Sequence, residues 1–213
     1  MSQLGLKIIL GAFIGVPLVI GLTKFNKADR VGRLFVLFIG AGSVVDTVML
    51  TSIYFDKTRY LLLIFNVYSL LEALFFFWFV WATALSDFIR NIAKALLYLT
   101  LPLWILFIFI FPLLVKEISR SAAFDTTYYI ITSFLAGFAL LQLVENEKSV
   151  FTSSSFWFTL GIFFCSFCTF DIMTFLQTIL ANKSWFLNNV FNIISYAFYS
   201  LGFWYLKVKP ISG

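Results

Sequence analysis

The sequence predicts an all-α fold, a bundle of seven transmembrane helices, on three observations. Of its 213 residues, 62% are hydrophobic and only 12% are charged, whereas about a quarter of the residues of a soluble domain are charged. Apolar stretches long enough to cross a bilayer recur along the chain. Short charged stretches separate them. Because seven spans leave no room for a soluble domain, we expect a single domain over residues 1–213.

Three predicted spans lie in the first part of the chain. The first covers about residues 5–23 and is followed by a basic loop from Lys24 to Arg33. No small-residue cleavage site follows it, so we expect it to remain as a helix rather than be removed as a signal peptide. The second and third spans cover about residues 34–54 and 60–82, and Asp56, Lys57 and Arg59 separate them.

The other four spans are predicted at about residues 95–115, 124–144, 156–180 and 186–206. Asp87, Arg90 and Lys94 mark the loop before the fourth span. The fourth span has no charged residue between Leu96 and Val115. We therefore expect it at the lipid-facing edge of the bundle, with Pro102 and Pro112 as sources of a kink.

The distribution of basic residues predicts the orientation. With the N-terminus outside, nine Lys and Arg lie on the inner side and six on the outer side, and the first loop alone contributes four of the nine. The positive-inside rule then places the N-terminus out and the C-terminus in. We expect a multi-pass protein of the cell membrane, such as the bacterial inner membrane. Membrane anchoring accounts for the net charge of +5, so this charge does not indicate nucleic acid as a partner.

Composition also excludes several chemistries. The chain contains no His, which removes imidazole metal sites and His-based catalytic triads. We expect no metal, no cofactor and no catalytic residue. Cys165 and Cys168 lie in an apolar run and are expected to pack as small apolar side chains rather than to act as a redox pair.

Three acidic residues fall inside predicted spans, namely Asp46, Glu72 and Asp171. A charged side chain at mid-membrane costs at least about 2.5 to 3.5 kcal/mol on insertion scales, so such residues face the bundle interior and indicate function. No Lys or Arg lies at a comparable depth in the sequence. We expect the three acids to line one outward-facing polar cavity.

Helical spacing adds polar neighbours to these acids. In the third span Asn66, Tyr68 and Ser69 precede Glu72, and a stripe from Asn188 to Gly202 follows one face of the seventh span. The alternative interpretation of the stripe is interhelical hydrogen bonding alone. The predicted ligand-binding or cation-binding residues are Asp46, Asn66, Tyr68, Ser69, Glu72, Asp171, Asn188, Asn192 and Tyr199.

Three stretches resemble a group of small seven-helix bacterial membrane proteins: FNVYSLLEALFF, FWFTLGIFF and NNVFNIISYAFYSLGFW. They cover the third, sixth and seventh spans. Glu72, Asn188 and Asn192 fit the pattern of that group. The resemblance implies the seven-helix fold and carries no known activity with it.

The sequence favours a sensor or receptor-like protein that binds a small ligand or cation and signals to a membrane-bound partner such as a kinase. The partner would dock on the loop Lys24 to Arg33 and the tail Lys207 to Gly213, since the chain has no effector domain. The alternative is a proton- or cation-coupled transporter or channel, although no inverted repeat is visible. An enzyme using paired carboxylates ranks third. The bilayer is the expected surrounding, and homo-oligomerisation stays open.

Overall fold

The computed structural model describes residues 3–54, 61–110, 122–175 and 181–206. Within these ranges the chain forms seven long helices and no strand, which confirms the all-α class. The long helices are α1 (Gln3–Lys24), α2 (Arg30–Tyr54), α3 (Leu61–Thr83), α4 (Asp87–Ile105), α6 (Ala122–Asn146), α7 (Ser154–Phe175) and α8 (Ala181–Trp204). Shorter helical turns are η1 (Phe25–Lys27), η3 (Leu106–Ile110) and η4 (Val150–Thr152).

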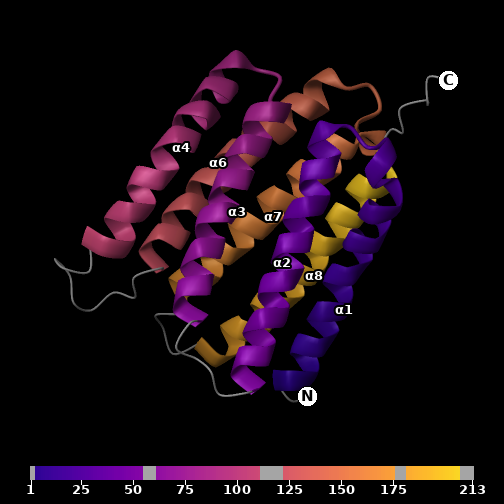
Figure 1. Cartoon of the computed structure of the whole chain (residues 1–213). Coiled ribbons are helices and arrows are strands. Elements are labelled where there is room, and N and C mark those ends of the chain that lie inside the picture. Colours follow the sequence, from indigo (N-terminus) through magenta and orange to yellow (C-terminus); the bar gives the residue numbers. More distant parts are fainter. Residues whose placement is uncertain (1–2, 55–60, 111–121, 176–180, 207–213) are drawn as a thin grey trace.

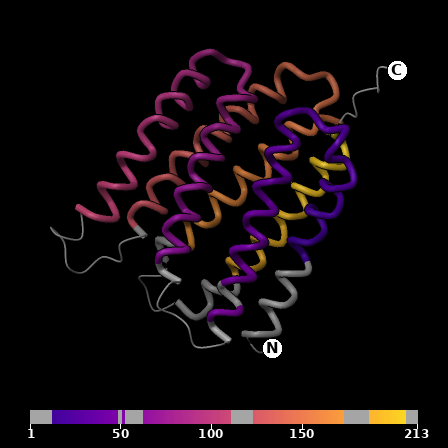
Figure 2. The backbone as a smooth tube through the Cα atoms, viewed as in Figure 1, coloured from indigo at the N-terminus to yellow at the C-terminus, as the bar shows by residue number. Residues whose placement is uncertain are grey.

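Successive helices run in opposite directions, as Figures 1 and 2 show, and the two termini lie at opposite ends of the bundle. We call the end where α1 begins the N-terminal end and the end that carries η1 and η4 the C-terminal end. Six helices pack in the cyclic order α1, α2, α3, α6, α7 and α8, and α4 packs outside this ring against α3 and α6. Across the ring, α3 also contacts α7.

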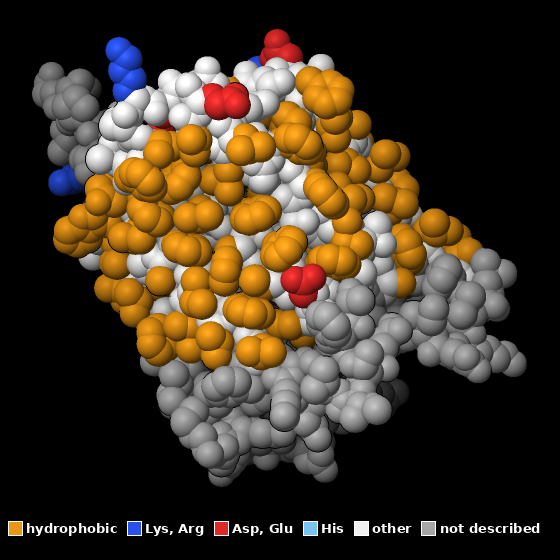
Figure 3. All heavy atoms as spheres, turned by 180° about the vertical axis from the view of Figure 1, so that it is seen from behind, with side chains coloured by type: hydrophobic (Ala, Val, Ile, Leu, Met, Phe, Trp, Pro, Cys, Tyr) orange, Lys and Arg blue, Asp and Glu red, His pale blue; other side chains and the backbone are white. Residues whose placement is uncertain are grey.

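The outer surface of the bundle is apolar. Figure 3 shows hydrophobic side chains covering the rear face, with charged side chains mainly at the C-terminal end. Five helices, α2, α3, α4 with η3, α6 and α7, are long and apolar enough to cross a membrane. Such a surface suits contact with lipid, because every backbone polar group is satisfied within the helices.

Helix α4 lies at the edge of the bundle, as expected. Only 17% of its apolar window is buried, and Tyr98 is 71% exposed. The continuous α-helix ends at Ile105, shortly after Pro102, and the chain continues as the π-helical turn η3. Proline removes a backbone donor, so the Tyr98 carbonyl, four residues before Pro102, loses its usual helical partner.

The expected start of this helix at about residue 95 was wrong. Helix α4 begins at Asp87, and the Ser86 hydroxyl caps it by accepting from the Phe88 amide at 3.2 Å. The first two turns are amphipathic: Asp87 and Arg90 pair at 3.0 Å on the exposed face, while Ile89 and Ala93 are buried. A hydropathy window rejects charged residues even where one helix face is apolar.

The C-terminal half of the bundle has a dry aromatic core. Phe35 on α2 is fully buried, stacks on Phe158 at a centroid distance of 4.2 Å and meets Phe79 edge-on at 5.4 Å. We call this group the Phe35 cluster; its members are Phe35, Phe38, Phe75, Phe79, Phe158 and Phe203. Close-packed aromatic rings leave little space for water, so this part of the interior is apolar.

Candidate functional site

The candidate site is centred on the carboxyl group of Glu72. This side chain lies in the middle of α3 and is 8% exposed. The hydroxyls of Tyr128 and Tyr129 both donate to its Oε2 atom, at 2.6 and 2.8 Å. Short hydrogen bonds to a carboxyl oxygen are stronger than those between neutral groups when the acid is ionised. Two phenols from α6 therefore hold the acid inside the bundle.

Two polar faces meet where α3 packs against α6. On α3, Ser69 and Glu72 are three residues apart, and on α6, Asp125 precedes Tyr128 by three residues, so each pair shares a helix face. The two helices run in the same direction (Figure 1). Ser69 lies against Asp125 and Glu72 lies against Tyr128, and both pairs are 56 residues apart in the chain. A regular ladder of polar contacts results.

Asp125 is a site residue that sequence reasoning missed. It is 2% exposed, and its Oδ1 atom has no hydrogen-bond partner among the described residues. It lies within electrostatic range of Glu72. The sequence signal was the spacing of Asp125, Tyr128 and Tyr129 at i, i+3 and i+4, but Asp125 stood at the edge of a predicted span, where a charged residue is ordinary.

Polar groups also approach Glu72 from the other side. A Cβ atom on Gly42 of α2 would lie 2.9 Å from the Tyr68 hydroxyl, so this phenol reaches from α3 onto α2. Asp46 lies one helical turn from Gly42 and within electrostatic range of both Glu72 and Tyr68. Cys165 of α7 and Tyr196 of α8 complete this side. Glu72 therefore interacts with groups from five helices.

Several buried polar atoms around the site have no partner in the part of the chain that the structure describes. Native proteins leave few such atoms, and each marks a place for water, an ion or a ligand. They lie in the middle of the bundle or toward its N-terminal end. The atoms are Asn66 Oδ1, Asp125 Oδ1, Thr132 Oγ1, Ser166 Oγ, Asn188 Oδ1 and Asn189 Nδ2.

The residues predicted for the site differ in their surroundings. Asn66, Ser69, Glu72 and Tyr199 are buried, Tyr68, Asp171, Asn188 and Asn192 are partly buried, and Asp46 is exposed. The structure brings Asp46 toward Glu72. Asp171 instead lies near Cys168. Of the three acids, the structure therefore brings only Asp46 and Glu72 toward each other among the described residues. Residues that the prediction did not include are Asp125, Tyr128, Tyr129, Cys165 and Tyr196.

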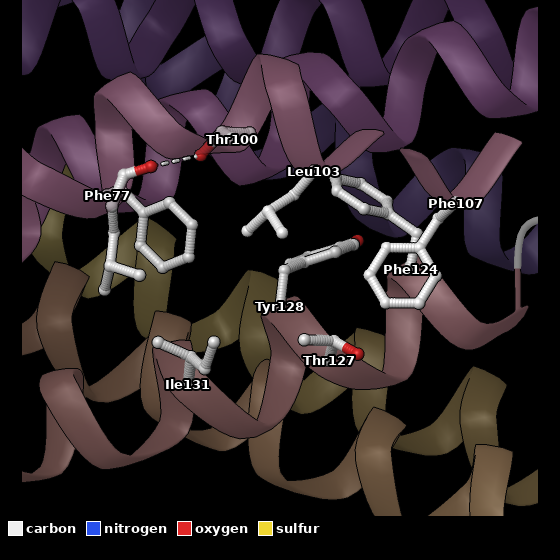
Figure 4. A pocket seen from close by; sticks show the side chains of 9 residues that line it. Phe77, Thr100, Leu103, Phe107, Phe124, Thr127, Tyr128 and Ile131 are labelled. Atoms are coloured by element: carbon white, nitrogen blue, oxygen red, sulfur yellow. Dashed lines mark hydrogen bonds between the residues drawn. The ribbon is translucent and has the colours of Figure 1, made fainter. Parts of the chain in front are cut away.

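A small cavity lies beside the site. Its volume is about 10 Å³, and Tyr128 extends into it together with Leu103, Phe124 and Ile131 (Figure 4). A volume of this size holds no more than about one water molecule. A larger cleft of about 520 Å³ lies at the C-terminal end and is lined by Asp29, Lys148 and the serines that begin α7. Neither of these two cavities is lined by the predicted site residues.

The chemistry of the site has to be derived from its own side chains. No family model, curated protein or solved structure matches the chain. Among the described residues, no group of three or more Cys, Asp or Glu is placed to hold a metal ion. The arrangement at Glu72 can accept hydrogen bonds, and its carboxyl groups can bind and release protons.

The polar region around Glu72 ends at an apolar layer on its C-terminal side. On α3 the buried polar residues Asn66, Ser69 and Glu72 give way to Phe76 and Phe79 toward the C-terminal end. Polar residues give way to phenylalanine in the same direction on α2, from Asp46 to Phe35, and on α7, from Cys165 to Phe158. Thr159 is buried beyond this level, but its hydroxyl is satisfied by the Ser155 carbonyl. The polar region thus extends toward the N-terminal end and stops at the Phe35 cluster.

Proposed function

We propose that the chain is a seven-span membrane sensor of the bacterial inner membrane, with its N-terminus outside and its C-terminus inside. The Glu72 site responds to a small ligand or cation that reaches it from outside. One observation supports the proposal: the buried polar residues extend toward the N-terminal end, and the packed Phe35 cluster lies between them and the C-terminal end. A site with access from one side suits detection, whereas transport needs access from both sides in turn.

Basic residues at the C-terminal end support this orientation. Lys27, Arg30 and Arg33 are exposed there, and positive charge favours the cytoplasmic side. Lys24 anchors the same end, because its Nζ donates to the Trp204 carbonyl at 2.6 Å and lies over the Trp204 ring. This contact joins the end of α1 to the end of α8.

Tyr199 offers a route for the signal. Its ring packs against Phe35 at a centroid distance of 5.0 Å, and it lies within electrostatic range of Glu72 and Cys165. It therefore packs against the Phe35 cluster and lies within electrostatic range of the polar site. A change of charge or hydrogen bonding at Glu72 would shift Tyr199 and, through Phe35, the end of α2 that carries Arg30.

In this proposal the output passes to a partner at the C-terminal end of the bundle. We place the docking surface for a membrane-bound signalling protein, such as a kinase, on the exposed Arg30 and Arg33 at the start of α2. The tail from Lys207 to Gly213, which the sequence also suggested, lies outside the described residues.

Affinity purification from cells that make the protein tests this proposal. Reversing both charges, Arg30→Glu with Arg33→Glu, should abolish stoichiometric co-purification of a membrane protein, because two favourable charge contacts become repulsive. Lys94→Glu, an exposed reversal on α4, is the matched control and should retain the partner. Equal recovery from the double variant and the wild type would contradict the assignment of this surface.

A proton-coupled transporter is the second candidate function, favoured by one observation. Asp125 and Glu72 are buried acids on neighbouring helices and lie in series along the bundle axis, as in proton relays. Proton flux into liposomes that contain the purified chain, if lost in Glu72→Gln, would replace the sensor with this alternative.

A further inference from the structure

We propose that Glu72 and Asp125 form a coupled pair of acids that binds one exchangeable proton, so that the ligand of the site is the proton itself. The inference rests on the proposed sensor function and names its ligand. The facts that carry it are the close packing around the two acids, their register on α3 and α6, and the buried oxygens of Asp125 and Asn66 that have no donor in the described part of the chain.

The first step concerns space. Glu72 is 8% exposed and Asp125 is 2% exposed, and Ser69, Ala73 and Tyr128 around them are at most 3% exposed. A ligand with several heavy atoms would have to displace these side chains. A proton needs no additional volume, so it can bind to the site as the structure shows it.

The second step concerns the repulsion between the two acids. Asp125 lies one turn before Tyr128, the residue that donates to Glu72, and the two carboxyl groups interact electrostatically. Two negative charges on neighbouring helices in a medium of low dielectric repel each other. No described Lys or Arg forms an ion pair with either acid. One proton on the pair removes this repulsion, and groups that interact in this way titrate as a unit.

The third step concerns the oxygens that can carry the proton. Both phenols donate to Oε2 of Glu72, which leaves Oε1 for a proton. Oδ1 of Asp125 and Oδ1 of Asn66 are buried acceptors without a donor among the described residues. A protonated carboxyl oxygen is a hydrogen-bond donor. A proton on Asp125 Oδ1 therefore supplies a donor in a region where these buried acceptors have none among the described residues.

The transfer between the two acids is balanced. When the proton leaves Asp125 for Glu72, Asp125 becomes a carboxylate as Glu72 becomes a neutral acid, and the net charge of the pair is unchanged. Asp125 lies nearer the N-terminal end of the bundle than Glu72 does, because α3 and α6 run in the same direction. A proton from the outer side would therefore meet Asp125 first.

Other titratable groups face the pair and bear on its pH response. From α4 the Trp104 indole reaches this region and donates to the Asn66 carbonyl. The indole does not titrate. The titratable groups are Asp46 of α2, Tyr68 of α3, Tyr128 and Tyr129 of α6, Cys165 of α7, and Tyr196 and Tyr199 of α8. Phenols and a thiol titrate at higher pH than carboxyls, so an infrared carboxyl band separates the two acids from these groups. The carboxyl of Asp46 is separated from the pair by the variants Glu72→Gln and Asp125→Asn, which keep it.

Infrared difference spectroscopy of the full chain in lipid nanodiscs, recorded over a pH titration, tests the pair. We expect a protonated-carboxyl band in the wild type. In Glu72→Gln and in Asp125→Asn one band disappears, and the midpoint of the remaining acid moves by about one pH unit or more, because its partner no longer carries charge. Glu145→Gln, on the exposed part of α6, is the matched control and should leave the midpoint in place.

The opposite result is equally definite. If each variant removes one band and leaves the midpoint of the other acid unchanged, or if no band requires Glu72 or Asp125, the proton pair is overturned. Should either variant fail to fold, Ser69→Ala, which keeps both acids, must still shift the titration. These outcomes concern the ligand alone, since co-purification of the partner tests the sensor function separately.

Discussion

At the scale of single residues, the Glu72 site destabilises the folded bundle, because burying its acids costs more free energy than their hydrogen bonds contribute. Burying a carboxyl group carries a large desolvation penalty, and the two phenol hydrogen bonds offset only part of it. Hydrogen bonds between membrane helices average about 0.6 kcal/mol and reach about 1.7 kcal/mol. The buried Asp125 with its unpartnered oxygen adds a further cost. A partly satisfied polar network is less stable than an apolar core, so this network indicates function.

Tyr129→Phe should destabilise the bundle by roughly 0.6 to 1.7 kcal/mol, because Glu72 loses one of its two donors. The loss should be smaller when Glu72 is already replaced by Gln, since a neutral amide forms weaker hydrogen bonds. Unfolding in a denaturing detergent measures both values and gives the coupling energy. Tyr98→Phe, at a phenol that is 71% exposed on α4, serves as the control. Equal costs at the two tyrosines would show that the Tyr129 hydroxyl adds nothing.

At the scale of helices, the contact between α7 and α8 positions the Phe35 cluster and Tyr199 on the C-terminal side of the site. Glycine allows the helices to approach closely there: a Cβ atom on Gly202 would lie 2.5 Å from the Phe158 ring. Gly161 is equally confined, against the Tyr199 ring. Both rings contact Phe35, so this seam places the members of the Phe35 cluster and the tyrosine that links them to Glu72.

Gly202→Ala should therefore lower the free energy of unfolding by about 1 to 3 kcal/mol, since overpacking forces side chains from their rotamers. Gly15→Ala is the matched control, because nothing lies within 4 Å of a Cβ at that position. There the helix propensity of Ala should stabilise α1 by up to about 1 kcal/mol. Thermal or detergent unfolding compares the two, and a Gly202→Ala protein as stable as the Gly15→Ala protein would refute the close packing.

At the scale of the whole molecule, the interior of the bundle is polar toward the N-terminal end and apolar toward the C-terminal end. The sequence predicted the all-α fold, because a run of apolar residues long enough to span a bilayer is a local property that hydropathy detects. The prediction failed at the start of α4 for the same reason, because hydropathy detects apolar runs alone. Asp87, Arg90 and Lys94 resemble a loop to a hydropathy window, whereas Ser86 and the buried Ile89 show that they begin a helix.

The site was predictable only in part. Asn66, Ser69 and Glu72 follow one face at three-residue steps, and all three are buried as predicted. Their partners on α6 lie more than 50 residues away in the chain. Nothing local in the sequence reveals that α6 packs beside α3 in the same direction, so Tyr128, Tyr129 and Asp125 were missed. The resemblance to small seven-helix bacterial membrane proteins stays a prediction.

The central claim is that the polar region can be reached from the N-terminal side alone, and thiol accessibility tests it most directly. Asn192→Cys places a thiol in this region on α8, in a background where Cys165 and Cys168 are Ala. Ser200→Cys, two turns further along α8 near the Phe35 cluster, is the control. A membrane-impermeant maleimide should label position 192 from the outside of intact cells and not from inside-out vesicles. Labelling of position 192 from the cytoplasmic side would contradict the one-sided site.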